Sequence, residues 1–406
     1  MVDASAADFD SQFLSQVCPT TMHAPRLKVL HFTTTVGGGG AEQMLCNVVE
    51  AMARKGIQSV VVSTTSSVGD NSLRSRLEAA GPFYDLDAKS LLSWKMIRQF
   101  RRILKDEKPN IVQTWMHNSG VIAGALARMA GVKNVVWGVH SKDIFFGGNP
   151  GWMKSFVNRK VLGAASRRVP KRIISCSQIA MRVHEEEVGY PSGKMVWIGN
   201  GIDTDRFTPS HEVRRESREK FGIPQDAKVV GMVGRMNPVK DVPTFLRAAA
   251  ELQKRNPKAH IVLSGQGVEE ADEITKSANL ELPDPARMHW IGYQKEVEKI
   301  YPMFDVMALT STTEAFPMVL IEAMSCGVPC VSTNVGDAAL ILGEVGKVTP
   351  VGDSEKIGEA WDEILNLDDD SHQVLSSRAR EFSVERFGLE HCASRYLQVY
   401  EQLLAA

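Results

Sequence analysis

The feature that most constrains the fold of this 406-residue chain is an alternation of short, β-branched apolar runs with longer helical segments. The apolar runs are nearly continuous, which is typical of central strands in a parallel sheet that helices cover on both faces. The series occurs twice, so it predicts an α/β fold with two tandem Rossmann-like, doubly wound domains that face a central cleft. The expected strands are residues 28–32, 58–64, 111–114, 134–139, 172–176 and 195–198 in the first series, and residues 229–233, 260–264, 288–291, 306–309, 330–333 and 347–349 in the second.

The sequence also indicates where the domains begin and end. Residues 1–25 contain no Lys or Arg and no continuous apolar core, so we expect a disordered tail rather than a signal peptide. We assign residues 26–200 to an N-terminal domain and residues 201–389 to a C-terminal domain. The C-terminal residues 390–406 have an amphipathic helical pattern, and we expect this helix to pack back onto the first domain.

Charge is distributed unevenly along the chain. Residues 1–200 contain 25 Lys and Arg against 15 Asp and Glu, a net charge of +10, whereas residues 201–406 contain 22 against 33, a net charge of −11. The six cysteines show neither metal-ligand spacing nor a disulfide framework, which is typical of a reducing compartment. No apolar run reaches the roughly 18 residues of a spanning helix. We therefore expect a cytoplasmic protein.

Two segments of the basic half have the character of amphipathic helices with a cationic face. Residues 152–172 contain seven basic and no acidic residues, and residues 94–105 are similar. Such segments are most often ordinary surface helices. Together with the charge of +10, they favour peripheral contact with the inner face of an anionic membrane, or a pyrophosphate-bearing acceptor. Nucleic acid is not expected as a partner, because no nucleic-acid-binding module accompanies the charge.

Residues 310–333 carry the clearest local signals. A buried strand ends in a polar turn with Glu314, a helix is predicted to begin at Pro317 and end near Ser325, and Gly327 suits a left-handed position after it. Glu314 and Glu322 are eight positions apart, roughly 12 Å along a helix axis, which is too far to share a proton. We interpret them as separate hydrogen-bond acceptors for a ligand with hydroxyl groups at both ends.

Two loops that follow strands have the composition of phosphate sites. Residues 37–40 are all glycine and allow close approach of backbone to a ligand, although a glycine run alone is weak evidence. They match neither the dinucleotide fingerprint nor the phosphate loop of nucleotide hydrolases. In the second domain, Arg235 and Lys240 flank Pro238 just past a strand, and two such cations suit a diphosphate.

Two histidines and a pair of aspartates are further candidates for reactive groups. His140 ends a strand before a loop rich in glycine and aromatic residues, so we expect it to face the cleft as a proton partner or sugar contact. His117 is more simply structural. Asp203 and Asp205 form the Asp-x-Asp pattern that holds a divalent metal in many sugar-transferring enzymes. No strand precedes them here, so we interpret the pair as part of a turn and predict no metal site.

In this order, the motifs resemble those of the retaining glycosyltransferases of family 4, which have the two-domain GT-B fold. The resemblance covers the chain from about residue 26 to its end. It rests on GGGGAEQ, His140, IGNGIDTDRF, VGRMNPVKD, LSGQGVEE, and the spacing of Glu314 and Glu322. It implies that the N-terminal domain is the acceptor side and that the C-terminal domain binds a nucleotide-sugar.

The resemblance also implies roles for individual residues. Arg235 and Lys240 would bind the donor diphosphate, Glu322 the ribose, and Glu314 the transferred sugar, with His140 near the reacting carbon. Gly38 and Gly39 would line the phosphate side of the cleft, and Gly265 and Gly267 would lie near the base. The implied catalytic residues are His140, Arg235, Lys240 and Glu314, and the implied donor-binding residues are Gly38, Gly39, Gly265, Gly267, Phe316, Pro317, Met318, Val319 and Glu322.

The predicted function is thus a metal-independent hexosyltransferase. It would move a hexose or N-acetylhexosamine, with retention, from a nucleotide-sugar, preferably a UDP-sugar, to a glycan or lipid-linked acceptor in cell-surface polysaccharide synthesis. No cofactor is expected beyond the donor, which is a substrate. The alternatives are a sugar-nucleotide epimerase and a non-catalytic sugar-nucleotide sensor. An oxidoreductase is disfavoured because GxGxxG is absent.

Overall fold

A computed structural model describes residues 27–37, 40–65, 72–88, 90–141, 152–268 and 284–406. The expected tail, residues 1–25, lies outside the described residues, as do Gly38 and Gly39. Within the described residues, no helix is long and apolar enough to cross a membrane.

The first sheet has seven parallel strands in the order β3-β2-β1-β4-β5-β6-β7. The six strands expected here are present. The strand β3 was missed because it contains only three half-buried residues at the edge of the sheet, too few for a periodic signal. The strands are β1 (Lys28–Thr35), β2 (Gln58–Thr65), β3 (Phe83–Asp85), β4 (Ile111–Trp115), β5 (Asn134–Val139), β6 (Arg172–Ser175) and β7 (Met195–Trp197).

Helices cover both faces of this sheet, as the continuous apolar runs predicted. Neighbouring residues of a strand point to opposite faces, so Val29 of β1 packs in the core under α2, whereas Leu30 packs in the core under α4. Both side chains are fully buried. The helices of this half are α2 (Gly40–Arg54), α3 (Ser72–Ala80), α4 (Trp94–Glu107), α5 (His117–Met129), α6 (Trp152–Arg168) and α7 (Gln178–Val183), which continues into a π-helical turn, η1 (His184–Val188).

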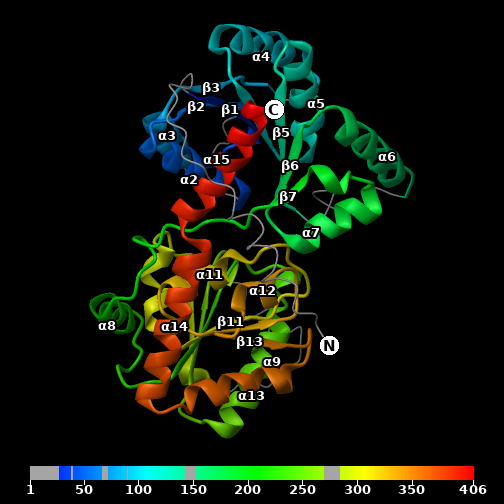
Figure 1. Ribbon diagram of the computed structural model, residues 1–406. Coiled ribbons are helices and arrows are strands. Elements are labelled where there is room, and N and C mark those ends of the chain that lie inside the picture. Colours follow the sequence, from blue (N-terminus) through cyan, green and yellow to red (C-terminus); the bar gives the residue numbers. More distant parts are fainter. Residues whose placement is uncertain (1–26, 38–39, 66–71, 89, 142–151, 269–283) are drawn as a thin grey trace.

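The second sheet repeats this arrangement with six parallel strands in the order β10-β9-β8-β11-β12-β13. All six expected strands are present, and the structure confirms the predicted pair of doubly wound α/β domains (Figure 1). The strands are β8 (Val229–Val233), β9 (His260–Ser264), β10 (Met288–Gly292), β11 (Val306–Leu309), β12 (Cys330–Thr333) and β13 (Lys347–Thr349). The helices are α8 (His211–Lys220), α9 (Val242–Arg255), α11 (Met318–Ser325), α12 (Ala338–Leu342), α13 (Ser354–Leu365) and α14 (Asp369–Phe387).

The carboxyl ends of the two sheets meet at the boundary between the domains. Ser177, just after β6, contacts Asp337, just after β12. Gly199, just after β7, lies against the ring of Phe316 in the loop after β11, since a Cβ on that glycine would sit 3.2 Å from the ring. Open parallel sheets bind ligands at these strand ends. The fold therefore places a site between the domains.

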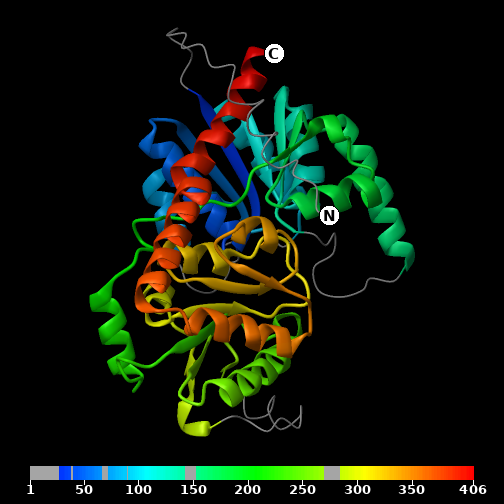
Figure 2. The same cartoon turned by 60° about the horizontal axis from the view of Figure 1, so that its bottom comes forward.

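The last helix, α15 (Leu389–Ala405), crosses from the second domain to the first. Figures 1 and 2 both show this red helix running alongside the blue helices of the first domain. Its residues Tyr396 and Tyr400 are buried in the core of the first domain, and the Tyr400 hydroxyl donates to Oε1 of Gln113 at 3.1 Å. The chain thus crosses between the domains at α15 as well as at the connection after β7.

Candidate active site

The loop after β8 holds Lys240 in a defined position. Asn237 Oδ1 accepts a hydrogen bond from the backbone N–H of Lys240 at 3.2 Å, which starts the short 3₁₀ turn η3 (Pro238–Lys240). The Thr310 hydroxyl donates to the Lys240 carbonyl at 2.9 Å. The stem of Lys240 lies over Gly234, because a Cβ on that glycine would meet Lys240 Cε at 3.3 Å. The ammonium group is thereby directed toward the loop after β11.

The structure brings together two of the predicted catalytic residues. Lys240 Nζ lies 2.6 Å from Glu314 Oε1, and these side chains are only 17% and 19% exposed. The Ser311 hydroxyl donates to the same carboxylate oxygen at 2.9 Å. A partly desolvated ion pair is stronger than one at the open surface. The cation proposed for a diphosphate and the carboxylate proposed for a sugar thus share one site.

The Glu314 loop leads into α11, which begins one residue later than predicted. Pro317 is the N-cap and has an extended conformation, with φ −72° and ψ 98°, so Met318 is the first helical residue. Pro317 provides no side-chain cap, and the first N–H groups of a helix have no partner within the helix. Val319 follows in the first turn. This end of α11 therefore offers N–H groups and a positive dipole to an anion.

Glu322 lies one turn further along α11, on the same face as Met318. Its Oε2 accepts a hydrogen bond from the buried Tyr301 hydroxyl at 2.5 Å. Burial raises the pKa of the Glu322 carboxyl above its ordinary value, while the bond from Tyr301 and the charge of Arg206 oppose that rise. The carboxylate is thus held in place as an acceptor.

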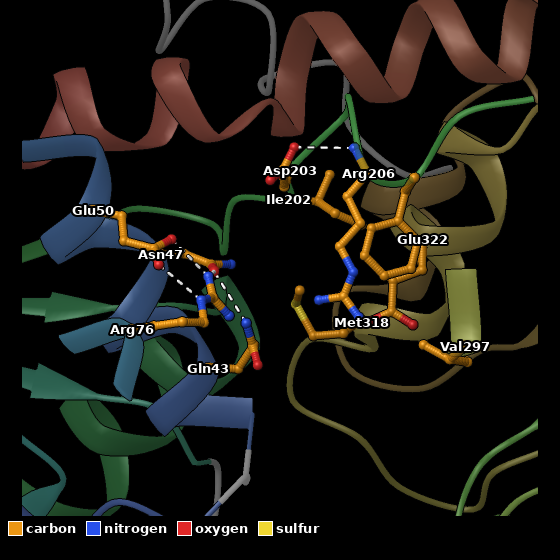
Figure 3. A pocket seen from close by; sticks show the side chains of 11 residues that line it. Gln43, Asn47, Glu50, Arg76, Ile202, Asp203, Arg206, Val297, Met318 and Glu322 are labelled. Atoms are coloured by element: carbon orange, nitrogen blue, oxygen red, sulfur yellow. Dashed lines mark hydrogen bonds and ion pairs between the residues drawn. The ribbon is translucent and has the colours of Figure 1, made fainter. Parts of the chain in front are cut away.

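A cavity of about 430 Å³ opens beside Glu322 and Met318, between the domains. Figure 3 shows its two walls: Gln43, Asn47, Glu50 and Arg76 come from α2 and α3, and they face residues of the second domain and the connecting chain across the gap. The second wall is formed by Ile202, Asp203, Arg206, Phe207, Val297, Met318 and Glu322.

The first-domain wall was not predicted from the sequence. Arg76 donates to both carboxylate oxygens of Glu50, at 2.8 and 2.6 Å. It also donates to Asn47 Oδ1 at 3.1 Å, and this oxygen accepts a further hydrogen bond from Gln43 Nε2 at 3.1 Å. A signal was available: Gln43, Asn47 and Glu50 are spaced by four and three residues in a helix whose other residues are mostly buried and apolar. Arg76 carries no comparable pattern.

His140 stacks on Trp115 with a ring separation of 4.8 Å. Burial lowers the pKa of its imidazole to about 4, against an opposing effect of the neighbouring Asn200. Even so, among the described residues neither ring nitrogen has a partner at hydrogen-bonding geometry, and nor does Asn200 Oδ1. The lowered pKa leaves His140 neutral at pH 7.

His117 and Asp203 have structural roles. His117 is structural, as interpreted: it hydrogen-bonds Tyr190 at 3.2 Å and His184 at 3.1 Å inside the core. Asp203 Oδ1 accepts from the backbone N–H groups of Asp205 and Arg206, both at 3.1 Å, which confirms its place in a turn.

The glycines after β9 allow two loops to touch. Gly265 has φ +148°, and a Cβ there would lie 1.8 Å from the Gly234 carbonyl oxygen. Gly267 has φ +86° and contacts Met236. Arg235 lies in the same region and is exposed. Among the described site residues, Lys240 and Glu314 form an ion pair, whereas neither Arg235 nor His140 has a hydrogen bond or ion pair to another of them.

Comparison with known proteins agrees with this architecture. Residues 38–206 match the family model described as Glycosyltransferase Family 4, and residues 213–382 match the model described as Glycosyl transferases group 1. N-acetyl-alpha-D-glucosaminyl L-malate synthase of Bacillus anthracis is 31% identical over 189 residues, which are 46% of this chain and 49% of that protein, so the chain spans about half its length. UDP-Gal:alpha-D-GlcNAc-diphosphoundecaprenol alpha-1,3-galactosyltransferase of Escherichia coli is 25% identical over 325 residues, 77% of this chain and 79% of that protein.

Solved structures show the same fold. Anabaena HepE in complex with UDP superposes with a TM-score of 0.78 at 20% identity, over 93% of this chain and 100% of that one. Its complex with UDP-glucose superposes with a TM-score of 0.75 at 19% identity over the same shares. With both halves of the chain matched by glycosyltransferase models and the two-domain fold in place, the chain belongs to the family 4-type glycosyltransferases of the GT-B fold.

Proposed function

We propose that the protein is a retaining hexosyltransferase that moves a hexose or N-acetylhexosamine from a nucleotide-diphosphate sugar to an acceptor hydroxyl. One observation carries the proposal: Lys240 lies 2.6 Å from Glu314, beside the N-terminus of α11 that no side chain caps. A cation, a helix N-terminus and a carboxylate in one site match a sugar diphosphate, which needs positive charge at the phosphates and an acceptor for sugar hydroxyls.

The proposed donor lies along α11. Its diphosphate takes the place of Glu314 beside Lys240, with Arg235 and the first N–H groups of α11 as further donors. Glu314 then accepts from a hydroxyl of the transferred sugar, and Glu322 accepts from the ribose. The base lies toward the loop with Gly265 and Gly267. Gly38 and Gly39 line the phosphate side of the cleft in this proposal, and both lie outside the described residues.

The chemistry follows from the leaving group. As the bond between the anomeric carbon and the phosphate oxygen breaks, negative charge grows on the diphosphate, and Lys240, Arg235 and the α11 dipole stabilise it. The acceptor oxygen forms the new bond on the same face, and its proton passes to the departing phosphate oxygen. In the proposed reaction these groups act without a metal. Neutral His140 contacts the sugar through its unpartnered nitrogens.

The relatives suggest which substrates to test. HepE was solved with UDP and with UDP-glucose, and the E. coli relative is named for a lipid-linked diphosphate acceptor. We propose a UDP-sugar donor and a glycan or lipid-linked acceptor of cell-surface polysaccharide synthesis. We further propose that the enzyme works in the cytoplasm, peripherally bound to the inner face of the membrane.

The outer face of α4 is the proposed membrane contact. Its cations are exposed while Met96 and Phe100 face the core, and Trp94 at its start is 76% exposed. An exposed tryptophan beside cations suits an anionic lipid surface. The proposal requires salt-sensitive binding to phosphatidylglycerol vesicles, which replacement of Arg101, Arg102 and Lys105 by Gln should abolish. Salt-insensitive or absent binding would refute it.

The central experiment is a thermal-shift screen of UDP-, GDP- and ADP-sugars, followed by product analysis with lipid-linked and soluble acceptors. Glu314→Ala and Lys240→Ala should each lower turnover by about 10²–10³-fold. Matched controls are Glu363→Ala and Lys347→Ala, which break an exposed ion pair of the same domain. Donor conversion without acceptor would indicate an epimerase instead. Binding without turnover would indicate a sensor.

A further inference from the structure

Asp337 joins the two domains through a buried carboxylate. It lies just before α12 in the second domain and is 3% exposed. Its Oδ1 accepts from the Ser177 hydroxyl and from the backbone N–H of Ile179, both at 3.1 Å, and its Oδ2 accepts from the N–H of Gln178 at 2.7 Å. All three donors belong to the start of α7 in the first domain. The side chain of one domain thus caps a helix of the other.

The same residue is in direct contact with the Glu314 loop. The backbone N–H of Asp337 donates to the carbonyl of Ala315 at 3.0 Å. The preceding residue, Gly336, has φ +51°, and a Cβ there would lie 2.6 Å from the Glu314 carbonyl oxygen and 2.5 Å from that of Ala315. The two loops therefore pack backbone against backbone, and a shift of one displaces the other.

The Glu314 loop has a second tie to the first domain. Phe316 is buried, and its ring lies against Gly199, in the chain that leaves β7. Separation of the domains would remove this contact together with the cap on α7. It would also leave the N–H groups of Gln178 and Ile179 without their carboxylate, because the acceptor is on the other domain.

We propose that Asp337 is a positioning residue that couples closure of the two domains to the geometry of the Glu314 loop. It acts through Ala315 and does not itself touch substrate. The inference rests on the proposed function only for the role of that loop in sugar transfer. Since hydrogen bonds to a charged group contribute more than neutral ones, each bond lost should shift the ratio of closed to open molecules by about tenfold, or about 1.4 kcal/mol.

The test compares Asp337→Asn with Asp353→Asn in the full chain. Asp353 is a matched control, because it caps α13 within the second domain, accepting from Lys356 N–H at 3.1 Å. In Asp337→Asn, an NH2 group replaces one of the two oxygens that accept from the N–H groups of Gln178 and Ile179, so at least one bond is lost while the side chain keeps its size. Hydrogen exchange without any substrate should accelerate about tenfold at Gln178 and Ile179 and also at residues 314–318. Small-angle scattering should show a larger radius of gyration.

Kinetics and a double variant complete the test. With a UDP-sugar, kcat should fall about tenfold in Asp337→Asn while the Kd of uridine stays unchanged, since the proposed contacts to ribose and base, at Glu322 and the loop with Gly265 and Gly267, all lie in the second domain. Ser177→Ala removes one partner, and its effect on exchange should be less than additive with that of Asp337→Asn. Two results would overturn the coupling and leave the proposed function intact. One is unchanged exchange at residues 314–318 in Asp337→Asn. The other is a wild-type kcat in Asp337→Asn although Glu314→Ala abolishes transfer. If the wild-type protein transfers no sugar, the proposed function fails, and the exchange data still decide the coupling.

Discussion

Replacement of His140 should change how the stability of the protein depends on pH. The pKa of His140 is lowered from 6.5 to about 4 by burial. The folded protein therefore binds fewer protons than the unfolded chain between these values. The contribution of neutral His140 to the free energy of unfolding is fully present above pH 6.5 and is lost as the pH falls toward the folded pKa. The buried ring beside Trp115 is thus a source of acid instability.

The magnitude follows from the width of that interval. One pKa unit corresponds to about 1.4 kcal/mol, so lowering the pH from 7 to 5 should cost about 2 kcal/mol through His140 alone. Buried His31 and His117, whose pKa values are lowered to about 3, act in the same direction. Glu322 and Asp337 act in the opposite direction, because burial raises their pKa values. Comparison with a variant that lacks only His140 separates its effect from the others.

The assay is urea unfolding of the wild-type protein and of His140→Asn at pH 7 and pH 5. The loss of unfolding free energy on acidification should be smaller in the variant by about 2 kcal/mol. His211→Asn is the control, because His211 is exposed at the start of α8. This variant should lose as much unfolding free energy between pH 7 and pH 5 as the wild type does. Equal losses in the wild type and His140→Asn would show that folding does not lower the pKa of His140, and would refute this reasoning.

Three further predictions concern the second domain. Gly265→Ala should destabilise the protein by about 2 kcal/mol or more in thermal unfolding, because a Cβ there would lie 1.8 Å from a neighbouring carbonyl oxygen; a change below about 0.5 kcal/mol would contradict this. Tyr301→Phe should weaken UDP binding by about tenfold in calorimetry, since Glu322 loses the hydroxyl that orients it, and an unchanged Kd would remove Glu322 from the site. Arg218→Met should lower the free energy of unfolding by about 3–5 kcal/mol, because the fully buried guanidinium pairs with Asp305 at 3.0 Å. Urea unfolding would measure this loss, and an unchanged free energy would show that the other partners of Asp305 satisfy it.

Much of the fold could be predicted because its signals are local. A short, largely apolar run lies at every expected strand, and Gly327 has the left-handed φ of +71° that its place after α11 requires. The approximate position of the site was predictable too, because parallel sheets place loops and helix N-termini together at one edge. The short edge strand β3 was missed, since three half-buried residues carry no period.

The pairings within the site were decided by tertiary structure. Lys240 and Glu314 are 74 residues apart, and only the neighbouring positions of β8 and β11 in the sheet bring their side chains to 2.6 Å. The sequence indicated a cation and a carboxylate but did not show that they neutralise each other in the free protein.

Contacts between the domains were even less predictable from the sequence. Arg76 and Asn47 reach the cavity beside Glu322 only because the first domain packs over α11, and Asp337 caps a helix about 160 residues earlier in the chain. Apolar period and turn residues determine which segments become strands, helices and loops. The angle and distance between two finished domains depend on many side chains packing together, and no local pattern records that arrangement.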